Sequence, residues 1–240
     1  MVAAVILGGS ALFTAAVGRW LLLATGLLSA LAVMAVGINA EWLATLDTSA
    51  ETWFEAHRSR RWKVDADGIF RFIGSPVHVA SVAAVCGGLL SVRARSVIPA
   101  FLVIGGVGVG VVVEQTLKTV VGRTSTAVAE LQDRSLLNYE HSFPSGHVTG
   151  SAALLGMLAL CLGVGRSRAA KVALAVSVVV SVLFVAFLAV YTMAHTCTDV
   201  IGGMILGGAI VSLGAAVLEA STSRRSADPM PAEDLSPSYT

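Results

Sequence analysis

The sequence predicts an all-α fold, a polytopic membrane bundle of about six transmembrane helices. Hydrophobic residues make up 55% of the 240 residues, charged residues make up only 13%, and the mean hydropathy is +0.81. An ordinary soluble domain carries roughly 25% charged residues, so this chain lacks the polar surface that a soluble fold of its size needs. The apolar composition also excludes disorder for most of the chain. A formal net charge of +1 gives no support for a nucleic-acid partner.

Six apolar runs are long enough to cross a bilayer, whose hydrocarbon core of about 30 Å needs about 20 helical residues. They lie at about residues 20–40, 75–92, 97–117, 146–164, 172–193 and 200–218. Residues 2–17 are apolar but short, and three interpretations stay open: an extra span, a re-entrant start, or an extension of the first helix. We expect residues 1–220 to form a single membrane domain and residues 221–240 to form a flexible cytoplasmic tail.

Basic residues between the spans predict the orientation of the chain in the cell membrane. One side receives Arg19, Arg93, Arg95, Arg166, Arg168, Lys171, Arg224 and Arg225. Cytoplasmic loops are enriched in Lys and Arg, so this side is predicted to be cytoplasmic. The extracytoplasmic side receives residues 41–74, where apolar residues at helical spacing favour an amphipathic helix in the membrane interface. An ordinary loop helix outside the membrane is an equal alternative.

Ionisable residues near membrane helices are costly and usually functional. Three clusters of them, between residues 114 and 203, lie at span ends that face the same predicted side: Glu114, Lys118 and Arg123; His141 and His147; His195 and Asp199. We therefore expect a polar pocket at this face. Glu114 and Lys118 are four residues apart on one helix and are predicted to form an ion pair.

Two of these clusters have the residue types of a phosphoryl-transfer site. Pro144-Ser145-Gly146-His147 begins the fourth span, where free N–H groups and the helix dipole favour an anion. Asp199 can hold one imidazole nitrogen of His195 and leave the other as a nucleophile or base. The alternatives are a proline-glycine turn with a capping serine, and a purely structural His–Asp pair. Together with Lys118, these residues favour phosphoryl transfer through a phosphohistidine.

The same residues resemble the motifs of the type-2 phosphatidic acid phosphatase (PAP2) superfamily over about residues 70–215. The second motif is intact as Ser142-Phe143-Pro144-Ser145-Gly146-His147. The third keeps Tyr191, His195 and Asp199 at the family spacing, and the first keeps Leu117-Lys118. Two family arginines are missing, because Ser125-Thr126 replace the Arg-Pro of the first motif and Leu188-Ala189 replace the Ser-Arg of the third.

The resemblance implies a role for each matching residue. His195 is expected to be the nucleophile, Asp199 to orient it, and His147 to act as general acid and then as base. The expected phosphate-binding groups are Lys118, Ser145, the Gly146 amide and Arg123, the last as a partial substitute for a missing arginine. Arg134 is a weaker substitute. The resemblance implies no metal and no other cofactor.

The predicted function is that of an integral-membrane lipid phosphate phosphatase with its site on the extracytoplasmic face. Its substrate would be a phosphomonoester or diphosphate of an isoprenyl or phosphatidate-type lipid, so the expected partners are a lipid phosphate and the membrane. Two alternatives stay open. One is a transferase that passes the phosphoryl or phospho-headgroup to an alcohol, and the other is a non-catalytic relative that binds or moves a phospholipid. The sequence predicts no oligomeric state.

Overall fold

The computed structural model describes residues 2–123 and 142–227, and these form eight α-helices and no strand. The helices are α1 (Val2–Val36), α2 (Glu41–His57), α3 (Arg60–Gly74), α4 (Pro76–Ala94), α5 (Ile98–Val121), α6 (Gly146–Gly163), α7 (Arg168–Tyr191) and α8 (Cys197–Ala227). The predicted all-α class is confirmed.

Six helices in the described ranges are long and apolar enough to cross a membrane, as predicted. Their spans are Ala15–Val36, Pro76–Ala94, Ile98–Val121, Gly146–Gly163, Arg168–Tyr191 and Cys197–Thr222. Residues 2–17 belong to α1. Of the three interpretations left open, the structure therefore supports an extension of the first helix. At the other end, α8 continues to Ala227, which makes the first seven residues of the expected tail helical. The rest of that tail lies outside the described residues.

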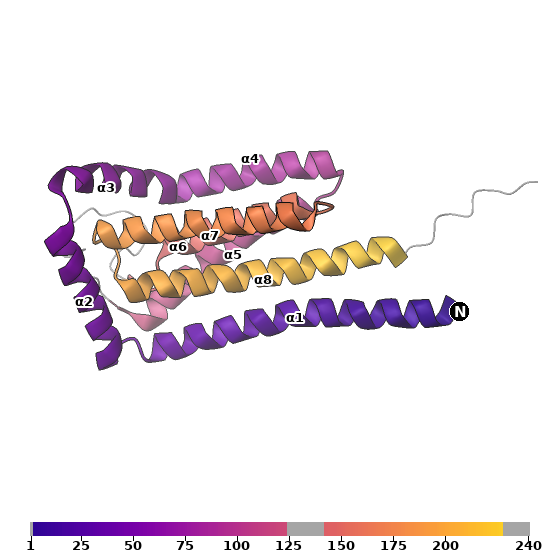
Figure 1. The fold of residues 1–240 in the computed structure, drawn as a ribbon, viewed down its shortest axis with the longest axis horizontal. Helices are drawn as coiled ribbons and strands as arrows, with labels where there is room; N and C mark the ends of the chain where they lie inside the picture. Colours follow the sequence, from indigo (N-terminus) through magenta and orange to yellow (C-terminus); the bar gives the residue numbers. More distant parts are fainter. Residues whose placement is uncertain (1, 124–141, 228–240) are drawn as a thin grey trace, which may run out of the picture.

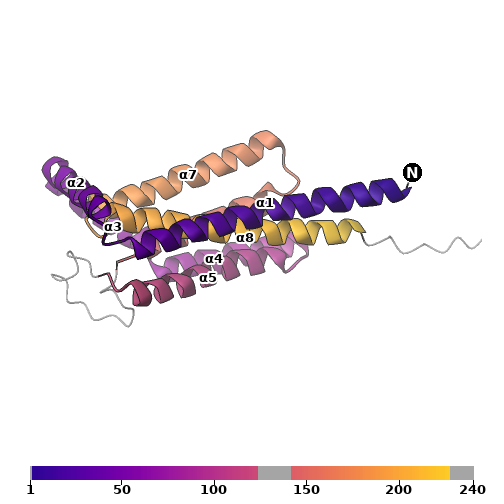
Figure 2. The same ribbon diagram turned by 90° about the horizontal axis from the view of Figure 1, so that it is seen from below.

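The spanning helices run roughly along one direction, and α2 crosses one end of the bundle (Figure 1). The chain then returns through α3, which leads directly into α4 on the far side of the bundle from α1. Helix α1 packs along α8, as seen from below in Figure 2. The predicted helical character of residues 41–74 is confirmed in α2 and α3, whereas their location in the membrane interface stays a prediction.

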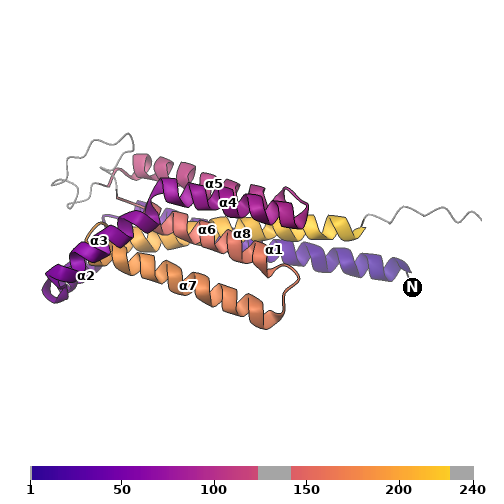
Figure 3. The same cartoon turned by 90° about the horizontal axis from the view of Figure 1, so that it is seen from above.

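Helices α6 and α8 are the most buried spans and form the centre of the molecule. Viewed from above in Figure 3, α7 leans away from the bundle at its N-terminal end, while α6 stays between α7 and the α4–α5 pair. The α6–α8 contact is close because α8 carries Gly203 and Gly207 at this face. A Cβ at Gly207 would overlap the side chain of Ala152 on α6. This close approach places the start of α8 directly beside the start of α6.

Candidate active site

The structure brings the three predicted polar clusters together at the end of the bundle that α2 crosses. Lys118 lies in the last turn of α5, His147 in the first turn of α6, and Asp199 in the first turn of α8. His195 lies in the short connection between α7 and α8. His141, Arg134, Ser125 and Thr126 lie outside the described residues.

Backbone contacts hold the second and third motifs together. The amide of Ser145 donates to the carbonyl of Asp199 at 2.9 Å. The Phe143 ring is fully buried and lies against Gly202, where a Cβ would overlap it. The glycine pair that follows Asp199 therefore lets the start of α8 approach the loop before α6.

Ser145 is the N-cap residue of α6, but its side chain does not cap the helix. The residue is fully buried, and its Oγ has no hydrogen-bond partner among the described residues. Buried hydroxyl groups nearly always have a partner, so an unpartnered one at a helix N-terminus is a donor available to an anion. The alternative interpretation, in which the Ser145 side chain caps the helix, therefore does not match the structure.

His195 and Asp199 face each other across the start of α8. Nδ1 of His195 lies 3.5 Å from Oδ2 of Asp199 and makes no hydrogen bond to any residue of the ranges 2–123 and 142–227. Contacts of this kind are commonly long before substrate binds and shorten as charge develops on the ring. With Nδ1 directed at the carboxylate, the other ring nitrogen, Nε2, is left for chemistry.

The two predicted catalytic histidines lie close to each other. Their ring centres are 6.3 Å apart, and Phe70 of α3 stacks on His147 with a centre-to-centre distance of 4.2 Å. Gly74, at the end of the same helix, lies against the Cδ2 edge of the His147 ring. A Cβ at Gly74 would overlap that edge. Helix α3 therefore fixes the position of His147.

Asp199 is fully buried and accepts hydrogen bonds from several groups. They come from Arg123 Nη1 at 3.1 Å, the Thr196 amide at 3.2 Å and Ser142 Oγ at 3.3 Å. Arg123 also donates through Nη2 to Asp47 of α2 at 2.6 Å. Asp47 in turn accepts from the Thr198 amide at 2.8 Å. These bonds tie α2 to the start of α8 and leave Arg123 occupied by two carboxylates.

The contact of Arg123 with phosphate therefore stays a prediction, and the structure gives this side chain a second role in holding Asp199. Lys118 forms the predicted ion pair with Glu114, with 2.6 Å between Nζ and Oε1. The position of the missing third-motif arginine is Ala189, a fully buried residue of α7. The Ala189 carbonyl accepts hydrogen bonds from the amides of Ala194 and His195, so its backbone still shapes the loop that carries His195.

Three residues at this site are not predicted by the sequence: Phe70, Gly74 and Asp47. The sequence contains an indication for Asp47, because this residue lies four positions after Leu43 on the apolar face of α2. In the structure both side chains are buried. Phe70 and Gly74 had none, because only the folding of α3 over α6 brings them to His147.

Among the described residues, no cluster of three or more His, Cys, Asp or Glu side chains is placed to hold a metal ion. The absence of a metal or other cofactor thus stays a prediction from the resemblance.

Comparisons with known proteins agree with the sequence motifs. The family model of the PAP2 superfamily matches residues 99–223, which include Lys118 and all of the second and third motifs. A solved structure described as the first transmembrane PAP2 type phosphatidylglycerolphosphate phosphatase from Bacillus subtilis has a similar fold. It superposes with a TM-score of 0.69 and 20% sequence identity, covering 84% of this chain and 96% of that one. No curated protein sequence matches the chain. With the six apolar helices, these findings identify a multi-pass membrane protein.

Proposed function

Because the chain belongs to the PAP2 superfamily, we propose that it is a membrane phosphatase that hydrolyses a lipid phosphate through a phosphohistidine. The observation that carries the proposal is the juxtaposition of His147, His195 and Asp199, with the imidazole centres of the two histidines 6.3 Å apart. We further propose that the site faces the extracytoplasmic side, since the opposite ends of the spans carry Arg93, Arg95, Arg166 and Arg168.

The reaction follows from this geometry in two steps. In the first, Nε2 of His195 attacks phosphorus while the bond from phosphorus to the lipid oxygen breaks and His147 donates a proton to that oxygen. Asp199 stabilises the positive charge that develops on the His195 ring. In the second, His147 accepts a proton from water, the water oxygen attacks phosphorus, and the phosphorus–nitrogen bond breaks. Lys118, the Ser145 hydroxyl and the Gly146 amide offset the charge on the phosphate oxygens.

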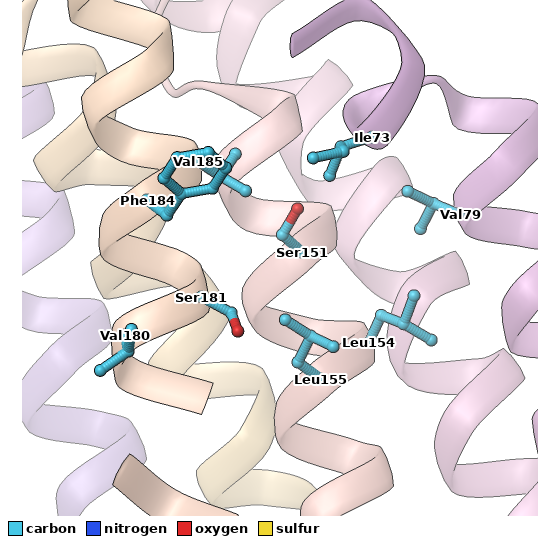
Figure 4. Close-up of a pocket in the computed structure, with 9 residues that line it drawn as sticks. All are labelled: Ile73, Val79, Ser151, Leu154, Leu155, Val180, Ser181, Phe184 and Val185. Atoms are coloured by element: carbon cyan, nitrogen blue, oxygen red, sulfur yellow. The ribbon is translucent and has the colours of Figure 1, made fainter. Parts of the chain in front are cut away.

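An apolar groove supports a lipid as the substrate. Its volume is about 500 Å³, and Figure 4 shows that α6 contributes its floor through Ser151, Leu154 and Leu155. The walls are Val180, Ser181, Phe184 and Val185 of α7 on one side and Ile73 and Val79 on the other. Ser151 lies four residues after His147, a rise of about 6 Å along a helix. We propose that a lipid whose phosphate is at His147 places its chain in this groove, one helical turn further along α6.

A screen for phosphate release tests the proposed function. The purified protein in detergent is incubated with lipid monophosphates and diphosphates of isoprenyl and phosphatidate type, and the His195→Ala variant serves as the blank. Release that depends on His195 supports a hydrolase. Transfer of the phosphoryl group to an added alcohol, with no release in its absence, supports the transferase instead.

Filling the groove should weaken binding of long-chain substrates selectively. Leu155→Trp places a large ring in the groove and is expected to raise the KM for a long-chain lipid phosphate by about tenfold, because apolar contacts of the chain are lost. The kcat/KM for a short-chain, water-soluble phosphate should stay near the wild-type value. The matched control is Leu162→Trp, at an exposed position on the same helix outside the groove. Equal losses with both substrates would contradict a chain-binding role.

Adding one methyl group beside His147 should lower activity. In Gly74→Ala the new Cβ meets the His147 ring, which must move, and misplacement of a catalytic group by about 1 Å commonly costs about a hundredfold in rate. We expect kcat to fall by about tenfold to a hundredfold in a phosphate-release assay. Gly68→Ala on the same helix is the control, since no atom of the part of the chain that the structure describes lies within 4 Å of its added Cβ. Similar losses in both variants would show that α3 itself is sensitive.

A non-catalytic phospholipid-binding protein is the second candidate. The observation that favours it is the apolar packing at Leu188 and Ala189, which leaves no arginine side chain where the family carries one. Orthovanadate binding distinguishes the candidates, because vanadate takes the geometry of the phosphoryl-transfer transition state. Saturable binding that needs both Lys118 and His195 supports the hydrolase, whereas binding that survives His195→Ala supports the second candidate.

A further inference from the structure

A buried carboxylate lies inside the proposed phosphate site. Glu114 is 6% exposed, and its Oε1 is 2.6 Å from Nζ of Lys118. Its carboxylate also lies directly against Gly146, where a Cβ would overlap all three carboxylate atoms. Gly146 is the first residue of α6, and its amide is one of the groups proposed to hold the phosphate. The carboxylate thus lies among the groups that the phosphate oxygens need.

The cations at the site are already paired with carboxylates. Lys118 is paired with Glu114, and Arg123 is paired with both Asp47 and Asp199. The Ser145 hydroxyl, by contrast, is buried without a partner, so the site retains one donor that nothing in the described chain satisfies. An incoming phosphate can use this donor, but it must compete for Lys118 with the Glu114 carboxylate.

The competition depends on the charge of the phosphate. Like charges a few ångströms apart repel strongly in a partly buried site, and the repulsion scales with the product of the charges. A doubly charged phosphate is therefore penalised about twice as much as a singly charged one if Glu114 stays in place. Displacing Glu114 instead breaks its ion pair with Lys118 and leaves a buried carboxylate without a cation.

We propose that Glu114 is a specificity-determining residue that acts as an internal competitor of phosphate. Its carboxylate occupies the cradle formed by Lys118, Ser145 and Gly146 and biases the site toward singly charged phosphate groups and against dianions and diphosphates. This inference rests on the proposed function for the location of the phosphate. It narrows the substrate class from any lipid phosphate to those whose phosphate carries a low charge.

Binding of two small anions tests the inference without turnover. Inorganic phosphate at mildly alkaline pH, where it is mostly a dianion, and dimethyl phosphate, a monoanion, are titrated into the detergent-solubilised protein by calorimetry. Glu114→Gln is expected to bind inorganic phosphate at least about tenfold more tightly than the wild type, with a smaller gain for dimethyl phosphate. Glu219→Gln removes a carboxylate twenty residues beyond Asp199 on α8 and should match the wild type. Unchanged or weaker phosphate binding by Glu114→Gln overturns the inference.

A double-mutant cycle identifies the partner. The gain from Glu114→Gln should be smaller when Lys118 is replaced by Met, because only the removal of charge repulsion then contributes and no ammonium group is freed. A gain that is undiminished without Lys118 contradicts the proposed competition for that ammonium group. If Glu114→Gln does not fold, Glu114→Asp serves in its place, since the shorter carboxylate withdraws from Gly146. It should bind inorganic phosphate more tightly than the wild type, and equal or weaker binding again overturns the inference.

Phosphate release from lipid phosphates, measured in parallel, separates this inference from the proposed function. If the protein releases no phosphate but Glu114→Gln still binds inorganic phosphate more tightly, the proposed hydrolase activity is contradicted and the competition by Glu114 is supported. If the protein hydrolyses a lipid phosphate but Glu114→Gln does not bind inorganic phosphate more tightly, the proposed activity is supported and the role of Glu114 is contradicted.

Discussion

Replacing His195 with alanine should reduce phosphate release by at least about a thousandfold, to the level of the blank. His195 supplies the nitrogen that attacks phosphorus in the proposed mechanism, and no other described side chain is placed to replace it. Loss of a covalent nucleophile removes the low-barrier route altogether, whereas loss of an orienting group only slows it. Asp199→Asn should therefore retain more activity than His195→Ala.

The measurement is phosphate release under single-turnover conditions, with acid-labile, base-stable phosphate on the protein as a second readout. The wild type should accumulate phosphoprotein when quenched early, and His195→Ala should accumulate none. His147→Ala should slow both steps but still permit some phosphoprotein to form, since the nucleophile is intact. Phosphate release by His195→Ala at the wild-type rate would contradict the phosphohistidine mechanism.

His57→Ala is the matched control for this series. The His57 ring stacks on Trp53 at 4.6 Å, and its Nδ1 lies 2.7 Å from the Trp53 carbonyl within the same helix, so it serves α2 alone. It is expected to have wild-type activity. A loss of activity on replacing any histidine, including this one, would indicate a general effect on folding rather than the removal of a nucleophile.

The sequence predicted the positions of the spans well because hydropathy and helix length are local properties. Each predicted run coincides with a helix, and the convergence of Lys118, His147 and Asp199 follows from counting alternate span ends. The Glu114–Lys118 ion pair was predictable for the same reason, since two residues four apart on a helix are neighbours in any fold.

What the sequence could not predict depends on contacts between distant segments. The stacking of Phe70 on His147 joins residues of α3 and α6, and no periodicity in either segment specifies it. The location of Glu114 against Gly146 likewise depends on how α5 packs beside α6. Arg123 was predicted from its distance to Lys118 in the sequence, but its actual partners are set by α2, whose packing on α8 brings Asp47 to it.

Replacing Arg123 with methionine should destabilise the protein strongly, and this is the second large effect that the structure predicts. The guanidinium lies between Asp47 and Asp199, whose side chains are 7% and 0% exposed. Without it, two buried carboxylates face each other with no cation between them. Breaking a buried ion pair from one side commonly costs about 3–5 kcal/mol. We expect a loss of that size in the free energy of unfolding, measured by denaturant titration in detergent.

A compensating substitution identifies the cause. Asp47→Asn in the Arg123→Met background removes one of the two facing charges and keeps the side-chain volume, so it should recover a substantial part of the lost stability. Arg19→Met removes an exposed arginine from α1 and should change the stability by no more than about 0.5 kcal/mol. Additive losses in the Arg123→Met, Asp47→Asn double variant would contradict the charge argument.

The same variants separate the two roles of Arg123. If it only holds Asp199, the rescued double variant should regain its stability and still bind orthovanadate with near wild-type affinity, because Lys118, Ser145 and Gly146 are untouched. If Arg123 also contacts the phosphate, vanadate binding stays weak after stability returns, since a lost charge-assisted contact is not replaced by the asparagine. The four hydrogen bonds from Arg123 to Asp47, Asp199, Thr196 and Thr198 favour the first outcome. Both terminal nitrogens are then engaged, Nη1 by the Asp199 carboxylate that faces His195 and by the two threonines, and Nη2 by Asp47.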